Sequence, residues 1–190
     1  MSPESRQRLL QLFKDRAVKF GKFKLVSGKQ STYYINSKKA LFYSEAVALL
    51  GEALWDLTHE RNIQAIGGPE VGAIPMATAA VMQYHLKGRA LEGFFVRKQA
   101  KAHGSQELIE GVLPPGARVA VVDDVLTTAG SVAQAIEAVE QAGAAVAAVV
   151  CIVDRLEGAR ERLTPRYNYL PIFTIRDFGI EPPVSEPARQ

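Results

Sequence analysis

The sequence predicts an α/β protein in which helices cover both faces of a central, mostly parallel sheet. Short, nearly unbroken apolar runs alternate with amphipathic segments of helical period over residues 44–178. Strands buried on both faces of a parallel sheet have this composition. The 190 residues are 47% hydrophobic and 23% charged, which is the balance of one ordinary globular domain.

The N-terminal part follows a different pattern. Ser2-Pro3-Glu4 is typical of a helix start, and the expected apolar stripe of that helix is Leu9, Leu10, Phe13 and Val18. Residues 20–39 alternate apolar side chains with lysines around a turn at Ser27-Gly28, which predicts a β-hairpin. We expect this helix and hairpin, residues 1–39, to form a small hood over an α/β core at 40–180, followed by a proline-rich tail at 181–190.

The core elements are expected in a regular order. Ser44 is the predicted cap of a helix that runs to about Arg61. Further strands are expected at residues 63–68, 90–98, 117–124, 144–154 and 173–178. Further helices are expected at residues 71–86, after the first of these strands, and 131–143, after the third.

Composition excludes several classes of protein. A net charge of +3 is too small to indicate a nucleic-acid partner by itself. The single cysteine, Cys151, lies in an apolar run and is expected to be a small buried side chain in a reduced, cytoplasmic protein. The N-terminus has no long apolar region, and the apolar stretch at 142–153 is too short for a bilayer, so we expect no membrane partner.

The stretch VVDDVLTTAGS, residues 121–131, carries the clearest chemistry. Asp123 and Asp124 end an apolar strand, and the next residues turn into a helix whose N-terminus can bind a phosphate. Two adjacent carboxylates would repel that phosphate, but they suit the hydroxyls of a ribose. The stretch therefore predicts a sugar-phosphate site. The alternative, a strand-end aspartate capping the next helix, would explain one carboxylate and not both.

Two further segments indicate anion binding. Gly68, Pro69, Glu70, Val71 and Gly72 form either a second anion loop or an ordinary strand-to-helix turn. Within FFVRKQAKAHGSQELIEG, residues 94–111, a basic segment that begins at Arg97 contains Arg97, Lys98, Lys101 and His103. It is either a lid over a pyrophosphate or a solvated face. GxxxxGK[ST] and GxGxxG motifs are absent from the sequence, which argues against nucleoside triphosphate and dinucleotide sites.

These motifs together resemble a known family. VVDDVLTTAGS is similar to the phosphoribosyl pyrophosphate (PRPP) motif of type I phosphoribosyltransferases. RKxxKxHG followed by EG resembles the catalytic loop of orotate phosphoribosyltransferases, and FKLVSGKQSTYYIN resembles their hood segment. The resemblance spans roughly residues 20–177. It implies the type I phosphoribosyltransferase fold and transfer of a phosphoribosyl group from PRPP to orotate with Mg²⁺, in pyrimidine biosynthesis. It also implies a homodimer whose lid is shared between subunits.

The resemblance assigns roles residue by residue. Catalytic roles fall to Lys101, His103, Asp123 and Asp124. PRPP would contact Arg97, Lys98, Lys101, His103, Asp123, Asp124, Val125, Leu126, Thr127, Thr128, Ala129, Gly130 and Ser131. Orotate would contact Tyr34, Ile35, Thr127 and Arg155, although Arg155 has the alternative of an ion pair with Asp154 or Glu157. No residue is expected to bind Mg²⁺ directly. Val26 and Val71 stand where several members carry a basic residue.

Two other functions are open at this point. The PRPP motif alone also allows a purine phosphoribosyltransferase, but the hood and the basic segment favour orotate. A PRPP-sensing regulator that binds nucleic acid could use the same fold. The hood is too short for a separate DNA-binding module, so no nucleic-acid partner is expected.

Overall fold

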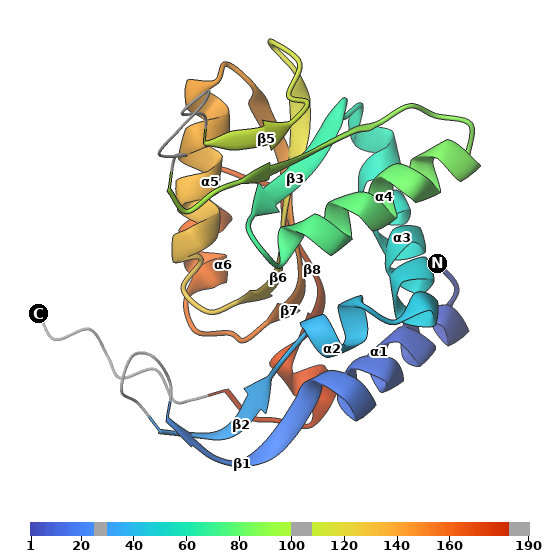
Figure 1. The fold of residues 1–190 in the computed structure, drawn as a ribbon. Coiled ribbons are helices and arrows are strands. Elements are labelled where there is room, and N and C mark those ends of the chain that lie inside the picture. The colour runs from blue at the N-terminus through green and yellow to red at the C-terminus, as the bar shows by residue number, and fades with distance from the viewer. Residues whose placement is uncertain (25–29, 100–107, 183–190) are drawn as a thin grey trace, which may run out of the picture.

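The central sheet has the predicted α/β architecture (Figure 1). The computed structural model describes residues 1–24, 30–99 and 108–182. Within them, six strands lie in the order β5-β4-β3-β6-β7-β8, and each neighbouring pair is parallel except β4 and β5. The strands are β3 Ala65–Pro69, β4 Glu92–Val96, β5 Ile109–Gly111, β6 Arg118–Leu126, β7 Ala145–Asp154 and β8 Tyr169–Thr174.

Helices cover both faces of this sheet, as the apolar strands predict. In Figure 1, α3 (Ser44–Thr58) and α4 (Ala73–Leu86) lie on one side, and α5 (Gly130–Gln141) and α6 (Ala159–Leu163) lie on the other. Val122 of β6 belongs to the buried cluster with α3 and α4, whereas its neighbour Val121 belongs to the cluster with α5 and α6. Successive side chains of a strand point to opposite faces, so β6 is apolar along its length because both faces are covered.

The hood forms as expected from its local signals. Helix α1, Pro3–Ala17, begins where the Ser2 hydroxyl accepts a hydrogen bond from the Ser5 N–H at 3.1 Å. The strands β1 (Val18–Lys24) and β2 (Gln30–Ile35) pair antiparallel as a hairpin, which lies below the sheet in Figure 1. Buried residues of α1, such as Phe13, belong to the cluster of α3 and α4. The hood boundary at residue 39 stays a prediction, and α2 (Lys38–Leu41) runs across it.

Several local expectations were wrong. Ser44 is the first residue of α3 and Tyr43 is its N-cap, without a side-chain cap bond. That helix ends at Thr58, and a 3₁₀ turn over His59–Arg61 continues to the expected end, where Asn62 adopts a left-handed conformation with φ 51°. Val18 is extended and begins β1 instead of ending α1. Apolar runs do not mark these boundaries, because caps and turns set them.

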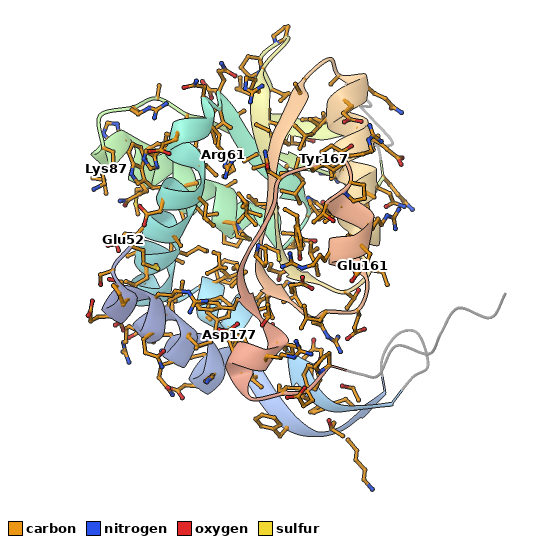
Figure 2. The ribbon with its side chains drawn as sticks, turned by 180° about the vertical axis from the view of Figure 1, so that it is seen from behind. Glu52, Arg61, Lys87, Glu161, Tyr167 and Asp177 are labelled. Atoms are coloured by element: carbon orange, nitrogen blue, oxygen red, sulfur yellow. The ribbon has the colours of Figure 1, made fainter. Side chains whose placement is uncertain are left out.

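The C-terminal part also differs from the expected strand at 173–178. The strand β8 ends at Thr174, and Ile175–Phe178 form a 3₁₀ helix. Asp177 causes this change of structure, because its Oδ2 accepts a hydrogen bond from the Thr174 N–H at 2.8 Å in a capping box. In the view from behind, Asp177 lies beside α1, where its carboxylate is 3.6 Å from the Arg6 guanidinium (Figure 2).

Two further expectations, one about Cys151 and one about membrane-spanning helices, can be compared with the structure. Cys151 is fully buried, as predicted, and burial raises the pKa of its thiol. Among the helices of the described residues, none has the length and apolar character needed to cross a membrane. The Ser27-Gly28 turn and residues 183–190 of the tail lie outside the described residues.

Candidate functional site

Three neighbouring strands bring the predicted site segments to one edge of the sheet. The strands β3, β6 and β7 are adjacent and parallel, so their carboxyl ends share that edge. The loops after them are also joined by backbone hydrogen bonds. The Arg155 N–H donates to the Leu126 carbonyl at 2.9 Å, and the Ala159 N–H donates to the Thr127 carbonyl at 3.0 Å. The sequence-predicted loops are therefore neighbours in space.

The two adjacent carboxylates lie within β6, which continues beyond them to Leu126. Asp124 Oδ2 accepts hydrogen bonds from the Ser37 hydroxyl and, at 3.0 Å, from the Lys38 Nζ. Asp123 Oδ1 accepts the Asp124 N–H at 2.9 Å. Neither carboxylate caps α5, because its N-cap is Ala129 and has no side-chain cap bond. The capping alternative is therefore wrong, and both side chains are available for another role.

The surroundings shift the pKa values of Asp123 and Asp124 in opposite directions. Burial, followed by the charge of Asp124, raises the pKa of Asp123 well above its usual range. Burial would also raise the pKa of Asp124, but the Ser37 hydrogen bond and the Lys38 ammonium outweigh it and lower that pKa. Asp124 is therefore the member of the pair that more readily carries the negative charge. Two carboxyl groups with divergent pKa values are typical of functional sites.

The loop between β6 and α5 presents hydroxyls and main-chain groups. Thr128 and Ser131 are exposed, whereas the side chains of Leu126 and Ala129 are buried in the cluster of α5 and α6. Ala129 adopts a left-handed conformation with φ 59° at the N-terminus of α5. Leu126 and Ala129 can therefore contact a ligand only through backbone atoms, and N–H groups at a helix N-terminus suit a phosphate. Phosphate binding by this loop stays a prediction.

The glycine loop after β3 packs directly on the carboxylates. A Cβ on Gly72 would lie 2.5 Å from Asp124 Oδ1, so any larger residue there would displace this carboxylate. The Glu70 N–H donates to the Val96 carbonyl at 2.9 Å, and Glu70 Oε1 accepts the Lys98 N–H at 3.0 Å. The loop therefore touches both the carboxylate pair and the first residues of the basic segment. Val71 on this loop is exposed.

Only part of the basic segment can be placed. The Arg97 N–H donates to the Leu108 carbonyl at 2.8 Å, and its guanidinium lies 3.8 Å from the Glu110 carboxylate. Residues 109–111 form β5 on the edge of the sheet, where a loop was expected. Lys101 and His103 lie outside the described residues, so their assignment to a lid stays a prediction.

Arg155 meets the hood through Tyr33. Its Nε donates to the Tyr33 hydroxyl at 2.9 Å, and its Cζ lies 4.8 Å from the centroid of the Tyr33 ring. Its Nη2 is also 2.9 Å from Glu157 Oε1, so the ion pair with Glu157 that the sequence left open is present. A guanidinium has enough donors for a second carboxylate. Its role toward orotate stays a prediction.

Sequence reasoning missed three residues of this site, namely Tyr33, Ser37 and Lys38. Strand alternation could have indicated that Tyr33 and Tyr34 face opposite sides of β2. Tyr33 is buried, whereas Tyr34 is 46% exposed and its ring lies 5.7 Å from that of Phe23. Assignment of Tyr34 and Ile35 to orotate stays a prediction. No local pattern indicates the contact of Lys38 with Asp124, because 86 positions separate them.

A metal site built by the protein alone needs several His, Cys, Asp or Glu side chains close together. Within residues 1–24, 30–99 and 108–182, no three or more His, Cys, Asp and Glu side chains gather as they would around a metal ion.

Comparisons with known proteins agree on the family. The family described as "Phosphoribosyl transferase domain" matches residues 42–186. The orotate phosphoribosyltransferase of Streptomyces coelicolor is 46% identical over 158 residues, covering 83% of this chain and 87% of that protein. Two crystal structures of the Mycobacterium tuberculosis orotate phosphoribosyltransferase each cover 93% of this chain and 99% of theirs. The complex with Fe(III) dicitrate has a TM-score of 0.83 at 37% identity, and the complex with PRPP has 0.79 at 32%. The chain therefore belongs to the orotate phosphoribosyltransferase family.

Proposed function

We propose that this protein transfers the phosphoribosyl group of PRPP to orotate, giving orotidine 5′-monophosphate and pyrophosphate. The observation that most supports this function is the position of the ionised Asp124 beside Asp123 at the sheet edge. The two carboxylates lie between the loops that lead into α4 and α5. An anionic acceptor flanked by two anion loops suits PRPP, which has vicinal hydroxyls between two phosphorylated ends. A relative at 32% identity was solved with PRPP bound, which supports this substrate.

In the proposed mechanism the protein positions and stabilises charge. The bond between the ribose C1 and the pyrophosphate oxygen breaks as an orotate ring nitrogen bonds to C1, and the proton of that nitrogen passes to solvent or to the leaving pyrophosphate. Asp123 and Asp124 accept hydrogen bonds from the ribose hydroxyls, and residues 127–131 hold the 5-phosphate. Residues 68–72 and the side chains of Arg97, Lys98, Lys101 and His103 receive the leaving pyrophosphate. The transition state resembles an oxocarbenium ion, so fixed charges act on it without a protein nucleophile.

We propose that the reaction uses Mg²⁺, as the family resemblance implies. Mg²⁺ is commonly held by one or two carboxylates together with the phosphates of a substrate. When bound, the ion neutralises charge on the pyrophosphate. No direct protein ligand is assigned.

The proposal extends to a cytoplasmic homodimer whose basic segment reaches the partner's site. Its support is the family resemblance of that segment. Subunit complementation tests it: mixing Lys101→Ala with Asp124→Asn protein should restore activity that neither variant has, because one site type in the mixed dimer carries both native residues. Absence of restored activity in verified mixed dimers would contradict the shared lid.

Orotate consumption, followed by ultraviolet absorbance, tests the reaction itself. We expect orotate to disappear only when PRPP, Mg²⁺ and enzyme are all present. Turnover of hypoxanthine or adenine in place of orotate would overturn the base assignment. Tight PRPP binding without turnover of any base, together with salt-sensitive RNA binding, would favour a regulator.

Tyr33→Phe tests the connection between the hood and Arg155. The variant loses the hydroxyl that accepts from Arg155 Nε, so we expect the KM for orotate to rise about 3- to 10-fold, as one hydrogen bond predicts. The KM for PRPP should stay unchanged in steady-state measurements. Tyr167→Phe is the matched control, because its hydroxyl donates to Glu140 on another part of the molecule (Figure 2). If Tyr33→Phe and Tyr167→Phe changed the KM for orotate equally, the contact between Tyr33 and Arg155 would have no role in orotate binding.

A further inference from the structure

One oxygen of Asp124 is held from outside the core by two consecutive hood residues. The Ser37 hydroxyl and the Lys38 Nζ both donate to Asp124 Oδ2. Ser37 is 1% exposed, whereas the Lys38 side chain is 47% exposed. The lysine therefore reaches from the surface to a buried carboxylate. Its aliphatic stem allows this, because lysine can keep part of its side chain in water.

The element that carries these two donors is firmly anchored. The backbone N–H groups of Ala40 and Leu41 donate to the Ser37 carbonyl, each at 2.9 Å. The side chains of Ala40 and Leu41 are buried in the cluster of α3 and α4. The position of the Lys38 ammonium is thus set by packing of α2 as well as by its attraction to Asp124.

The other sides of the Asp124 carboxylate are also constrained. Its Oδ1 accepts the Val125 N–H at 2.9 Å, and the Gly72 backbone lies against it. Among the described residues, the titratable groups that act on the carboxylate pair are Lys38 of α2 and the buried Cys151 thiol of β7. Lys38 is therefore the charged partner that favours ionisation of the pair.

We propose that Lys38 is a positioning residue for the reaction, which holds the Asp124 carboxylate in place as the acceptor for a ribose hydroxyl of PRPP. The inference rests on the proposed function only for its ligand, PRPP. Ser37 assists as a second donor to the same oxygen. The Lys38 charge also sets the pH range of the acceptor, since an ammonium at 3.0 Å stabilises the ionised carboxylate.

PRPP binding measured by calorimetry between pH 5.5 and 8.5 tests the proposal without orotate. We expect Lys38→Met to bind PRPP about 10-fold or more weakly at neutral pH, as loss of a charge-assisted hydrogen bond predicts. Removing the ammonium raises the pKa of Asp124, so the carboxylate is protonated where the wild type is still ionised. As the pH falls, binding by Lys38→Met should therefore be lost at a higher pH than in the wild type.

Two variants separate this role from a general effect. Lys38→Arg keeps the charge and should bind PRPP within about threefold of the wild type, with its pH dependence, because a guanidinium also donates to carboxylates. Lys39→Met removes a neighbouring exposed lysine and should match the wild type. Circular dichroism establishes that each variant is folded.

The outcomes separate the inference from the proposed function. Wild-type affinity and pH dependence in Lys38→Met would overturn the positioning role, and so would equal impairment of folded Lys38→Arg. A wild-type protein that binds PRPP without consuming orotate would contradict the proposed reaction. PRPP binding by the wild type and by Lys38→Met would still decide whether Lys38 positions Asp124.

Discussion

Asp124→Asn is expected to lower kcat/KM for PRPP by about 10²- to 10³-fold, the range seen when a preorganised charge-stabilising group is removed. The substitution keeps the shape of the side chain but removes its charge. The amide would either face the Ser37 and Lys38 donors with its own NH₂ group or turn that group toward the ribose hydroxyls. Steady-state kinetics with varied PRPP measures the loss.

Stability should change less than activity. Asp123 and Asp124 are both 8% exposed, and the charge of Asp124 is one cause of the raised pKa of Asp123. Removing that charge relieves a repulsion between buried groups, so the pKa of Asp123 should fall toward its usual range. It also removes the charge that the Ser37 hydroxyl and the Lys38 ammonium stabilise, and this loss opposes the first effect. We expect a melting temperature close to that of the wild type.

Asp15→Asn is the matched control for Asp124→Asn. Asp15 lies on the exposed face of α1, where its Oδ1 accepts from Gln11 Nε2 at 2.7 Å. Its kinetics should equal those of the wild type. Activity of Asp124→Asn within about threefold of the wild type would contradict the role assigned to this carboxylate.

Gly68→Ala is expected to destabilise the fold by about 3 kcal/mol or more, because overpacking against backbone cannot be relieved by a rotamer change. A Cβ on Gly68 would lie 1.9 Å from the Val122 carbonyl oxygen in the neighbouring strand. That strand carries the carboxylate pair and is buried on both faces, so it has no room to shift. The free energy of unfolding in urea measures the effect.

Gly72→Ala should separate function from folding. Its Cβ would meet the carboxylate of Asp124, at 2.5 Å from Oδ1, and a side chain can move where a strand cannot. We expect a loss of about 1 kcal/mol in stability, at the low end for overpacking, but at least about a tenfold loss in kcat/KM. The displaced carboxylate would leave Ser37 and Lys38.

Gly130→Ala serves as the stability control for both glycine variants. Apart from the neighbouring backbone of α5, no atom of the described residues lies within 4 Å of the place that a Cβ on Gly130 would take. Alanine is also a better helix former than glycine, so the unfolding free energy should equal or exceed that of the wild type. If Gly68→Ala unfolds with the same free energy as Gly130→Ala, the close approach of β3 and β6 is not the reason for glycine at position 68.

The long apolar strands and their helices could be predicted from the sequence alone. β6 and β7 are recognisable because burial on both faces requires nearly continuous apolar residues, as in Val119–Val122. Three-residue β5 and the 3₁₀ helix at Ile175–Phe178 could not be predicted. Their formation depends on an antiparallel edge contact with β4 and on the Asp177 capping box, and neither gives a periodic signal.

For the site, the sequence determined the chemistry of each loop: carboxylates after an apolar run, hydroxyls and glycines before a helix, and an arginine after the next strand. Parallel strands bring such residues to one edge, so their proximity follows once the sheet is recognised. Only the tertiary structure decided which hood residues meet them. Tyr33 contacts Arg155, and Lys38 contacts Asp124 across 86 positions, because the hood folds back onto the sheet edge. The opposite pKa shifts of Asp123 and Asp124 also come from the tertiary structure, since burial raises the pKa of Asp123 while Ser37 and Lys38 lower that of Asp124.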